Sequence, residues 1–224
     1  MNILVTGATG DIGSAICTDL RESGHVVYTS KSRIEDLEGI RWVCGEIQSL
    51  DGLVVCHGAP GCIKPSLDLT DEEFQKIIDV DLVGTFRVCR EAARGMIPRN
   101  RGHIVVVSSI HALATYPERA AYAAAKAGVC GLVRALAVEW AAKGLCVNAV
   151  LPGQVIDTKR TSRLIDNDEK AELWGRSPSG LMLNLQMVAE AVSFLLSSSG
   201  ISGHSLVVDD AWTASAWFKP HDQR

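Results

Sequence analysis

Glycines at 7, 10 and 13 follow a short apolar strand pattern at 3–6 and lead into a helical pattern at 12–23. Glycine lets the chain turn tightly, lets a pyrophosphate approach the backbone, and lets the helix pack on the sheet with its N–H groups facing the phosphates. A glycine turn without a ligand is the alternative, but strand and helix flank the motif in the order that a dinucleotide site requires. The turn therefore predicts a phosphate-binding site made of Gly7, Thr9, Gly10, Asp11, Ile12 and Gly13.

Short apolar runs alternate with longer helical patterns along the rest of the chain, whose 224 residues one hydrophobic core can accommodate. The expected strands are 3–6, 26–29, 53–56, 104–107, 146–150 and 205–208, and the expected helices are 12–23, 71–96, 120–143 and 187–197. Apolar strands interleaved with helices are typical of a parallel sheet covered on both faces. We expect an α/β fold with a single Rossmann-like doubly wound parallel sheet in one domain, 1–224, whose ligand binds at the carboxyl ends of the strands.

Two helix ends carry recognisable signals. Thr70 can cap the helix expected at 71–96, and Glu73 completes a capping box with it. Gly144 can end the helix expected at 120–143.

The region between the second and fourth strands is unusually short, since only 26 residues lie between Gly24 and Asp51. They must supply the second strand, a third strand expected near 41–44, and every crossover. A parallel connection normally takes a dozen or more residues, usually as a helix. At least one crossover helix should therefore be missing or reduced to a turn.

Composition excludes several classes of protein. The formal net charge is −4 without a dense basic run, so nucleic acid is not an expected partner. Neither a signal peptide nor an apolar stretch long enough for a membrane span is evident, and we expect a cytoplasmic protein. Seven cysteines are scattered through apolar stretches and are expected to be reduced core thiols. Cys56, His57 and Cys62 lack the remaining ligands of a zinc site, so no metal is expected.

A second motif combines Ser109 with Tyr122 and Lys126. Tyr122 and Lys126 are four residues apart and share a helix face, and Ser109 at the end of a strand can face them across a cleft. A phenol ionises too weakly for proton transfer at neutral pH, but an adjacent ammonium favours its phenolate form and makes it a usable acid or base. An ordinary helix surface that carries a tyrosine and a lysine is the alternative.

Four segments, TGATGDIG, SSIHALATYPERAAYAAAK, NAVLPGQVIDT and SGHSLVVDD, closely resemble the compact form of the short-chain dehydrogenase/reductase family. The resemblance covers nearly the whole chain. It implies hydride transfer between a nicotinamide cofactor and an alcohol or carbonyl substrate. Tyr122 would be the acid/base, Ser109 would hydrogen-bond the substrate oxygen, and Lys126 would favour the Tyr122 phenolate and hold the nicotinamide ribose.

The resemblance also implies the surroundings of the cofactor. Pro152, Gly153, Val155 and Thr158 would line the nicotinamide side, and the stretch 157–178 would lie over the substrate. The adenosine side would be contacted by Ser30, Lys31, Ser32, Arg33, Glu46, Ile47, Cys56, His57 and Gly58. Family members usually pair the alanine-rich helix between subunits, so a homotetramer, or failing that a homodimer, is expected.

Three positions depart from the family pattern. Val55-Cys56-His57-Gly58 stands where Asn-Asn-Ala-Gly is usual, and His57 either replaces an asparagine by stacking or hydrogen bonding or merely fills space. Asp81 stands where an asparagine usually anchors a relay water, and we expect it to accept a hydrogen bond near Lys126. Val208-Asp209-Asp210 stands where Asp-Gly is usual, so the resemblance does not predict the conformation of this turn.

The choice between the two nicotinamide cofactors depends on the residues after the second strand. An NAD site normally places an acidic residue there, which would repel a 2′-phosphate. Here Ser30-Lys31-Ser32-Arg33 follows the strand, and its cations and hydroxyls can pair with a phosphate. We expect NADP(H), with NAD(H) as the alternative if Lys31 and Arg33 are solvated and Glu35 or Glu46 holds the ribose.

Two other functions fit parts of the pattern. A non-catalytic dinucleotide-sensing protein would explain the changed asparagine positions and the shortened region, although it has no need of the Tyr122 acid/base. A sugar epimerase or dehydratase would suit TGATGDIG, although the chain leaves little room for a substrate domain. Apolar residues near the expected lid suggest a partly apolar carbonyl compound, or they simply pack the lid; they are Leu164, Leu173, Trp174, Leu181, Met182 and Leu183.

Overall fold

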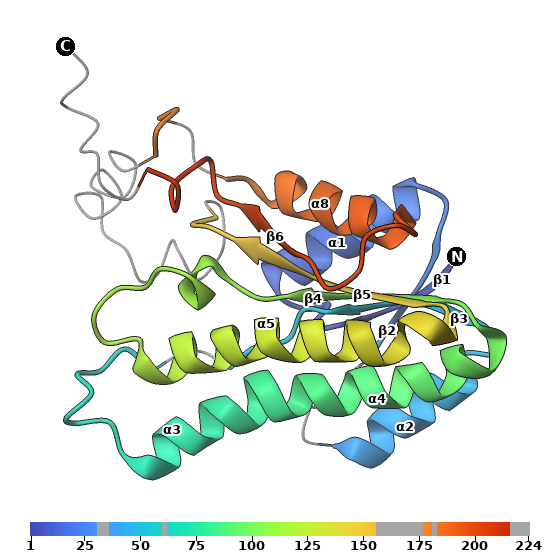
Figure 1. Ribbon diagram of the computed structural model, residues 1–224, viewed down its shortest axis with the longest axis horizontal. Coiled ribbons are helices and arrows are strands. Elements are labelled where there is room, and N and C mark those ends of the chain that lie inside the picture. The colour runs from blue at the N-terminus through green and yellow to red at the C-terminus, as the bar shows by residue number, and fades with distance from the viewer. Residues whose placement is uncertain (31–35, 60–61, 156–176, 181–182, 216–224) are drawn as a thin grey trace.

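A parallel sheet forms the centre of the computed structural model, which describes residues 1–30, 36–59, 62–155, 177–180 and 183–215 (Figure 1). Within these residues the sheet has six strands in the order β2-β1-β3-β4-β5-β6, each pairing parallel with its neighbours. The strands are β1 (Asn2–Thr6), β2 (Val26–Thr29), β3 (Leu50–Val55), β4 (Gly102–Val107), β5 (Leu145–Pro152) and β6 (Ser205–Val208). The order reverses between β1 and β3, the point at whose carboxyl edge a doubly wound sheet binds its ligand.

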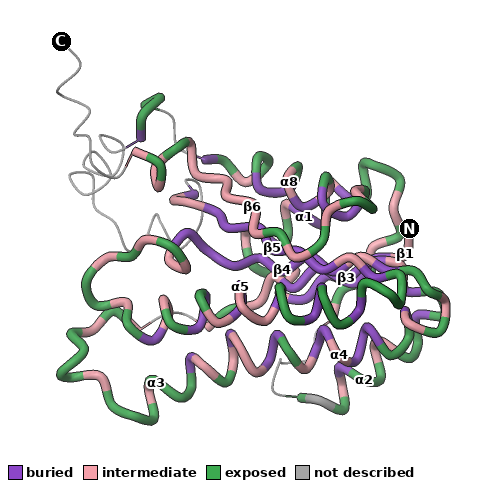
Figure 2. Tube along the Cα trace, in the orientation of Figure 1, coloured by how far each residue is buried: buried purple, intermediate pink, exposed green. Residues whose placement is uncertain are grey.

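Helices cover both faces of the sheet (Figure 1). The helices α1 (Asp11–Glu22) and α8 (Leu185–Ser197) lie on one face, and α2 (Leu37–Glu46), α4 (Gly84–Met96) and α5 (Ala120–Trp140) lie on the other. Successive residues of a strand point to opposite faces. In β1, Ile3 and Val5 therefore pack with α1 and α8, whereas Leu4 packs with the core of α4 and α5. The buried strands between the two helix layers are visible in Figure 2. The expected doubly wound Rossmann-like fold is confirmed.

Both expected helix-end signals are confirmed. At the start of α3 (Asp71–Ile78), Thr70 Oγ1 accepts a hydrogen bond from the Glu73 N–H at 3.3 Å, and Glu73 Oε2 accepts one from the Thr70 N–H at 3.0 Å. Gly144 follows the end of α5 and its short 3-10 extension with a φ of 74°. Glycine adopts this left-handed conformation without steric cost.

The helix expected at 71–96 is interrupted in its middle. A π-helical turn, Asp79–Val83, joins α3 to α4. The Thr85 hydroxyl donates to the Asp81 carbonyl at 2.7 Å and so satisfies a backbone acceptor within this irregular stretch. Single π-turns inside helices are frequent at functional sites, and this one carries the buried side chain of Asp81.

The prediction of a third strand near 41–44 is wrong, because these residues belong to α2. Its N-cap Asp36 accepts a hydrogen bond from the Gly39 N–H at 2.9 Å. Ile40, Val43, Cys44 and Ile47 follow a helical spacing and pack against the core formed with α4. Among the described residues α2 is the single crossover helix between β2 and β3, as the short connection predicts, and β2 is the edge strand.

By length and composition alone, Ala120–Lys143 is a candidate membrane span. Yet 44% of its most apolar window is buried, and α5 packs against β5. Core helices of globular folds share these properties, so the feature is weak evidence for a membrane.

Candidate active site

The glycine turn after β1 brings two backbone segments closer than a side chain would allow. Gly7 has a φ of 67°, and a Cβ there would lie 2.5 Å from the Cys56 carbonyl oxygen at the end of β3. A Cβ on Gly13 would lie 2.3 Å from the Gly7 carbonyl oxygen. Gly10 donates its N–H to that same carbonyl at 3.1 Å and caps α1 without a side chain. The turn thus presents backbone at a helix N-terminus, which fits the pyrophosphate of a dinucleotide.

Lys126 and Asp81 form a buried ion pair behind this cleft. Lys126 Nζ lies 3.2 Å from Asp81 Oδ2, and the two residues are 5% and 1% exposed. The other carboxylate oxygen of Asp81 accepts a hydrogen bond from the Ala59 N–H at 2.6 Å. Burial acts to lower the pKa of Lys126, but the opposing charges of Tyr122 and Asp81 together raise it above its ordinary value. Lys126 therefore remains an ammonium at neutral pH.

Tyr122 lies one helical turn before Lys126 on the same side of α5. The Lys126 ammonium is 5.4 Å from the centre of the Tyr122 ring. Ser109 follows β4 as the N-cap of a 3-10 turn, Ile110–Ala112, that packs against α5. The His111 N–H donates to Ser109 Oγ at 3.2 Å, so this oxygen accepts from the backbone while its own proton can be donated to a substrate oxygen.

His57 hydrogen-bonds through both nitrogens of its ring. Its Nδ1 lies 3.1 Å from Thr6 Oγ1, and its Nε2 lies 3.5 Å from Thr85 Oγ1. Burial, with a smaller contribution from the Lys126 charge, lowers the pKa of His57 to about 3. The imidazole is therefore neutral at physiological pH. These contacts support a hydrogen-bonding role for His57 over one of merely filling space.

The cysteines of the site are packing groups. Burial raises the pKa of Cys56 to about 12, so its thiol stays protonated. All seven cysteines are free thiols, and Cys17, Cys89 and Cys130 are buried.

Beyond β5, Gly153 lies close to the segment that follows β6. Its N–H donates to the Val208 carbonyl at 2.8 Å, and a Cβ on Gly153 would lie 2.9 Å from the Asp209 Cβ. Val155 forms an isolated parallel bridge with Leu183, and both are buried. Leu183 therefore packs in the core. Pro152, Gly153 and Val155 thus continue from the carboxyl end of β5, beside the cleft.

The turn at Asp209-Asp210, where Asp-Gly is usual in the family, forms without glycine. Asp210 adopts a φ of 54°, a left-handed conformation that Asp tolerates better than most residues. Its carboxylate accepts hydrogen bonds from Ser177 and, at 2.6 Å, from the Ser179 hydroxyl. These bonds lower the pKa of Asp210, the one from Ser177 contributing most.

The structure brings most of the expected site residues to the carboxyl edge of the sheet. They are Gly7, Thr9, Gly10, Asp11, Ile12, Gly13, Ser30, Cys56, His57, Gly58, Asp81, Ser109, Tyr122, Lys126, Pro152, Gly153 and Val155. It does not bring Glu46 and Ile47 there. They end α2 just before β3 begins, at the amino edge of the sheet, and Ile47 packs in the core.

Several expected residues fall on the undescribed segments. They are Lys31, Ser32, Arg33, Glu35, Thr158, Leu164, Leu173, Trp174, Leu181 and Met182.

An aromatic row beside Tyr122 was not expected. His111 contacts Tyr122 and Tyr116 edge-to-face with ring centres 5.4 Å and 5.0 Å apart, and Tyr116 contacts Trp212 at 5.7 Å. Gln154 donates to the Tyr116 hydroxyl at 3.2 Å. The position of His111 two residues after Ser109 is a usable sequence signal, but nothing local connects Trp212 to this row.

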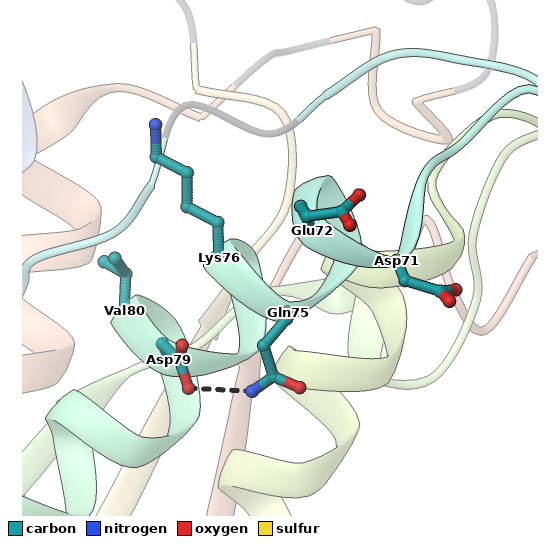
Figure 3. A pocket seen from close by; sticks show the side chains of 6 residues that line it. All are labelled: Asp71, Glu72, Gln75, Lys76, Asp79 and Val80. Atoms are coloured by element: carbon teal, nitrogen blue, oxygen red, sulfur yellow. Dashed lines mark hydrogen bonds between the residues drawn. The ribbon is translucent and has the colours of Figure 1, made fainter.

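A shallow open hollow of about 580 Å³ runs along α3 (Figure 3). Its described lining consists of Asp71, Glu72, Gln75, Lys76, Asp79 and Val80, and Lys76 and Val80 extend toward the same side of the helix. None of the expected site residues that the structure describes is among these lining residues.

Comparison with known proteins gives concordant matches. The family model described as enoyl-(acyl carrier protein) reductase matches residues 34–213. The 3-oxoacyl-[acyl-carrier-protein] reductase FabG of Rickettsia bellii is 34% identical, over 92% of this chain and 94% of its own length. The cis-4-hydroxycyclohexanecarboxylate dehydrogenase of Sinomonas cyclohexanicum is 33% identical, over 94% of this chain and 86% of its own.

Solved structures agree on the fold but differ in their described activities. A structure described as ribose-5-phosphate isomerase from Brucella melitensis matches with a TM-score of 0.85 at 29% identity, over 96% of this chain and 95% of its own. Levodione reductase matches with a TM-score of 0.87 at 24% identity, over 97% and 98%, which shows the fold alone. The family match and the similarity to FabG show that the chain belongs to the short-chain dehydrogenase/reductase family and is an NAD(P)-dependent enzyme of that family.

Proposed function

We propose that this enzyme transfers a hydride between NADP(H) and an alcohol or carbonyl substrate, with Tyr122 as the acid/base. The observation that carries the proposal is the arrangement of Tyr122 beside a buried Lys126 that is charged at neutral pH, at the sheet edge that holds the glycine turn. The bound nicotinamide supplies or accepts the hydride at the substrate carbon.

Tyr122 and Ser109 interact with the oxygen atom of the substrate. In reduction, Tyr122 gives its phenolic proton to the substrate oxygen as the carbonyl becomes an alcohol, and in oxidation it takes that proton back. Ser109 donates a hydrogen bond to the same oxygen, since its Oγ already accepts from the His111 N–H. Both groups stabilise charge that develops at this oxygen.

Lys126 and Asp81 assist Tyr122 in its proposed acid/base role. The Lys126 ammonium lies 5.4 Å from the centre of the Tyr122 ring and is also the group that we assign to the nicotinamide ribose hydroxyls. Asp81 takes the relay position as an acceptor near Lys126, with its carboxylate in ion-pair contact with the ammonium. In this arrangement a carboxylate contacts the lysine directly at 3.2 Å, without a bridging water.

NADP(H) rather than NAD(H) is the proposed cofactor. β2 pairs with β1, so Ser30 at its carboxyl end is adjacent to the strand that leads into the glycine turn. Lys31, Ser32 and Arg33 follow directly and would pair with the 2′-phosphate. Glu46 is no competitor as a ribose ligand, because it lies at the opposite edge of the sheet; Glu35 is the acidic alternative.

The assembly and location follow the expectations from sequence. We propose a cytoplasmic homotetramer, or failing that a homodimer, paired through α5. Val138 on this helix is 82% exposed, and its alanine-rich surface allows close helix approach.

A dinucleotide-sensing protein without turnover is the second candidate. The direct ion pair favours it, because a lysine held by Asp81 is less available to a ribose hydroxyl. The intact Ser109, Tyr122 and Lys126 favour the enzyme, since a sensor has no need of an acid/base.

A panel of carbonyl substrates, read by loss of NADPH absorbance, separates the two candidates. We expect turnover on at least one partly apolar carbonyl compound, and Tyr122→Phe should abolish it while cofactor binding stays within a few-fold. Tyr28→Phe, on the outer strand β2, is the matched control and should leave turnover unchanged. NADPH binding without turnover on any member of the panel would support the sensor.

A further inference from the structure

Three hydrogen bonds and one ion pair connect the start of the glycine turn to Lys126. The connection starts at Thr6, the last residue of β1, and passes through the His57 ring to the Thr85 hydroxyl. Thr85 in turn donates to the Asp81 carbonyl at 2.7 Å, and the Asp81 carboxylate contacts Lys126 at 3.2 Å. The side chains of Thr6, Asp81, Thr85 and Lys126 are all buried, so water does not compete freely for these bonds.

The direction of each bond in this network can be assigned from its chemistry. The single hydroxyl proton of Thr85 is used on the Asp81 carbonyl, so Thr85 Oγ1 can only accept from His57 Nε2. His57 therefore carries its proton on Nε2, and its Nδ1 accepts from the Thr6 hydroxyl. Thr6 Oγ1 has a free lone pair for the Cys56 N–H, which donates to it at 3.4 Å.

The same stretch of chain also holds the Asp81 carboxylate. Ala59, two residues after His57, donates its N–H to Asp81 Oδ1 at 2.6 Å. The segment 57–59 thus contacts the π-helical turn directly through the Ala59 backbone, and contacts the first turn of α4 through the imidazole and Thr85. The turn cannot shift along the helix without breaking one of these contacts.

We propose that His57 is a positioning residue, which in its neutral Nε2-protonated form holds the Thr85–Asp81 turn in place and thereby fixes Lys126 beside Tyr122. His57 does not transfer a proton itself. Its contribution is to keep Asp81 at ion-pair distance from Lys126 and to tie this pair to the end of β1, where the glycine turn begins. The inference rests on the proposed function of Lys126 and Tyr122.

Three variants test the inference. Thr85→Val keeps the shape of the side chain but removes the hydroxyl that joins His57 to Asp81. His57→Phe keeps an aromatic ring and removes both of its hydrogen bonds, and His57→Asn restores an amide donor and acceptor. Thr18→Val is the matched control, because the Thr18 hydroxyl bonds only its own helix, at the Ser14 carbonyl.

We expect Thr85→Val and His57→Phe to lower kcat about 10-fold, a part of what acid–base catalysis contributes. The KM for cofactor should change less than two-fold in Thr85→Val, since the Thr85 hydroxyl contacts His57 and the Asp81 carbonyl and not the glycine turn itself. His57→Asn should recover kcat to within about three-fold of the wild type, because an amide can replace both bonds. Thr18→Val should behave as the wild type.

A second readout does not need turnover. The pKa of Lys126, followed by NMR of 13C-labelled lysine with Lys126→Arg for assignment, should fall in Thr85→Val because the Asp81 carboxylate loosens. Wild-type kcat and an unchanged Lys126 pKa in Thr85→Val would overturn the inference. This result would be decisive even if His57→Phe does not fold, because it is measured on Thr85→Val alone. A protein without turnover whose Lys126 pKa falls in Thr85→Val would contradict the proposed function and leave the positioning role intact.

Discussion

Two substitutions at Asp81 separate the contribution of its charge from the contribution of its hydrogen bond. Its carboxylate contacts the Lys126 ammonium at 3.2 Å and accepts from the Ala59 N–H at 2.6 Å, and both charged groups are at least nine-tenths buried. Removing one partner of a buried pair leaves an uncompensated charge and costs about 3–5 kcal/mol. Asp81→Leu should therefore lower the free energy of unfolding at pH 7 by about this amount in urea denaturation.

Asp81→Asn should be far less damaging. An amide oxygen can still accept from the Ala59 N–H or from Lys126, so the proposed acceptor position is kept. We expect near-wild-type or slightly higher kcat in Asp81→Asn, whereas Asp81→Leu should lower kcat by about 10²-fold, the lower end of what positioned acid–base catalysis contributes.

The stability difference should depend on pH in a defined direction. In the wild type the pKa of Lys126 is raised, so the pair stabilises fully below the unfolded value near ~10.4 and loses this contribution as pH rises through the folded pKa. In Asp81→Leu burial is no longer opposed by the carboxylate, and the pKa of Lys126 should fall. The deficit of the variant should therefore shrink as the pH rises from about 7 to 10.

The control for these variants is Asp79→Leu, in the same π-helical turn but exposed to solvent. It should leave kcat unchanged. Equal activity in the wild type, Asp81→Asn and Asp81→Leu would show that Asp81 has no part in proton transfer, and a deficit that does not vary with pH would refute the ion-pair argument.

Three further predictions concern the cofactor cleft and the short crossover. Gly7→Ala should weaken cofactor binding strongly and destabilise the fold, because φ is 67° and the new Cβ would lie 2.5 Å from a backbone oxygen; isothermal titration and thermal unfolding measure both, and near-normal binding would contradict the close approach. The double variant Lys31→Ala/Arg33→Ala should lower the ratio of kcat/KM for NADPH to that for NADH, whereas an NADH preference in the wild type or an unmoved ratio would point to Glu35. Glu91→Ala should destabilise the protein by about 1–3 kcal/mol, because this buried carboxylate pairs with Arg41, Arg90 and Arg94 and joins α2 to α4; a change below about 0.5 kcal/mol in chemical denaturation would show that the pairs contribute little.

The parts of the fold that sequence predicts are those with a local pattern. The strand bounds of β2 and β6 match the prediction, because each is a short run rich in β-branched and apolar residues. The Thr70–Glu73 capping box forms as expected, because its hydrogen bonds join residues only three apart. The strand expected at 41–44 failed because a run of apolar residues fits a buried strand and a buried helix equally well. The helical spacing from Ile40 to Ile47 is the better guide.

The site was predictable in its residue types and less so in its contacts. Spacing along one helix places Tyr122 beside Lys126, and a residue at a strand end places Ser109 near them. The proximity of Asp81 to Lys126 was expected from the family resemblance, although the π-helical turn that carries Asp81 was not, and the His57–Thr85 contact joins residues 28 apart. Glu46 and Ile47 were misplaced because the missing strand removes the loop that would have brought them to the cleft.

The central claim is that Tyr122 exchanges the proton, and single-turnover kinetics of Tyr122→Phe with bound NADPH and a reducible carbonyl substrate test it most directly. The variant loses one hydroxyl and no packing volume, so the account predicts a rate of NADPH oxidation lower by about 10²–10⁴-fold, with cofactor affinity within a few-fold of the wild type. A rate above about a tenth of the wild-type value would contradict the account and remove Tyr122 from the acid/base role.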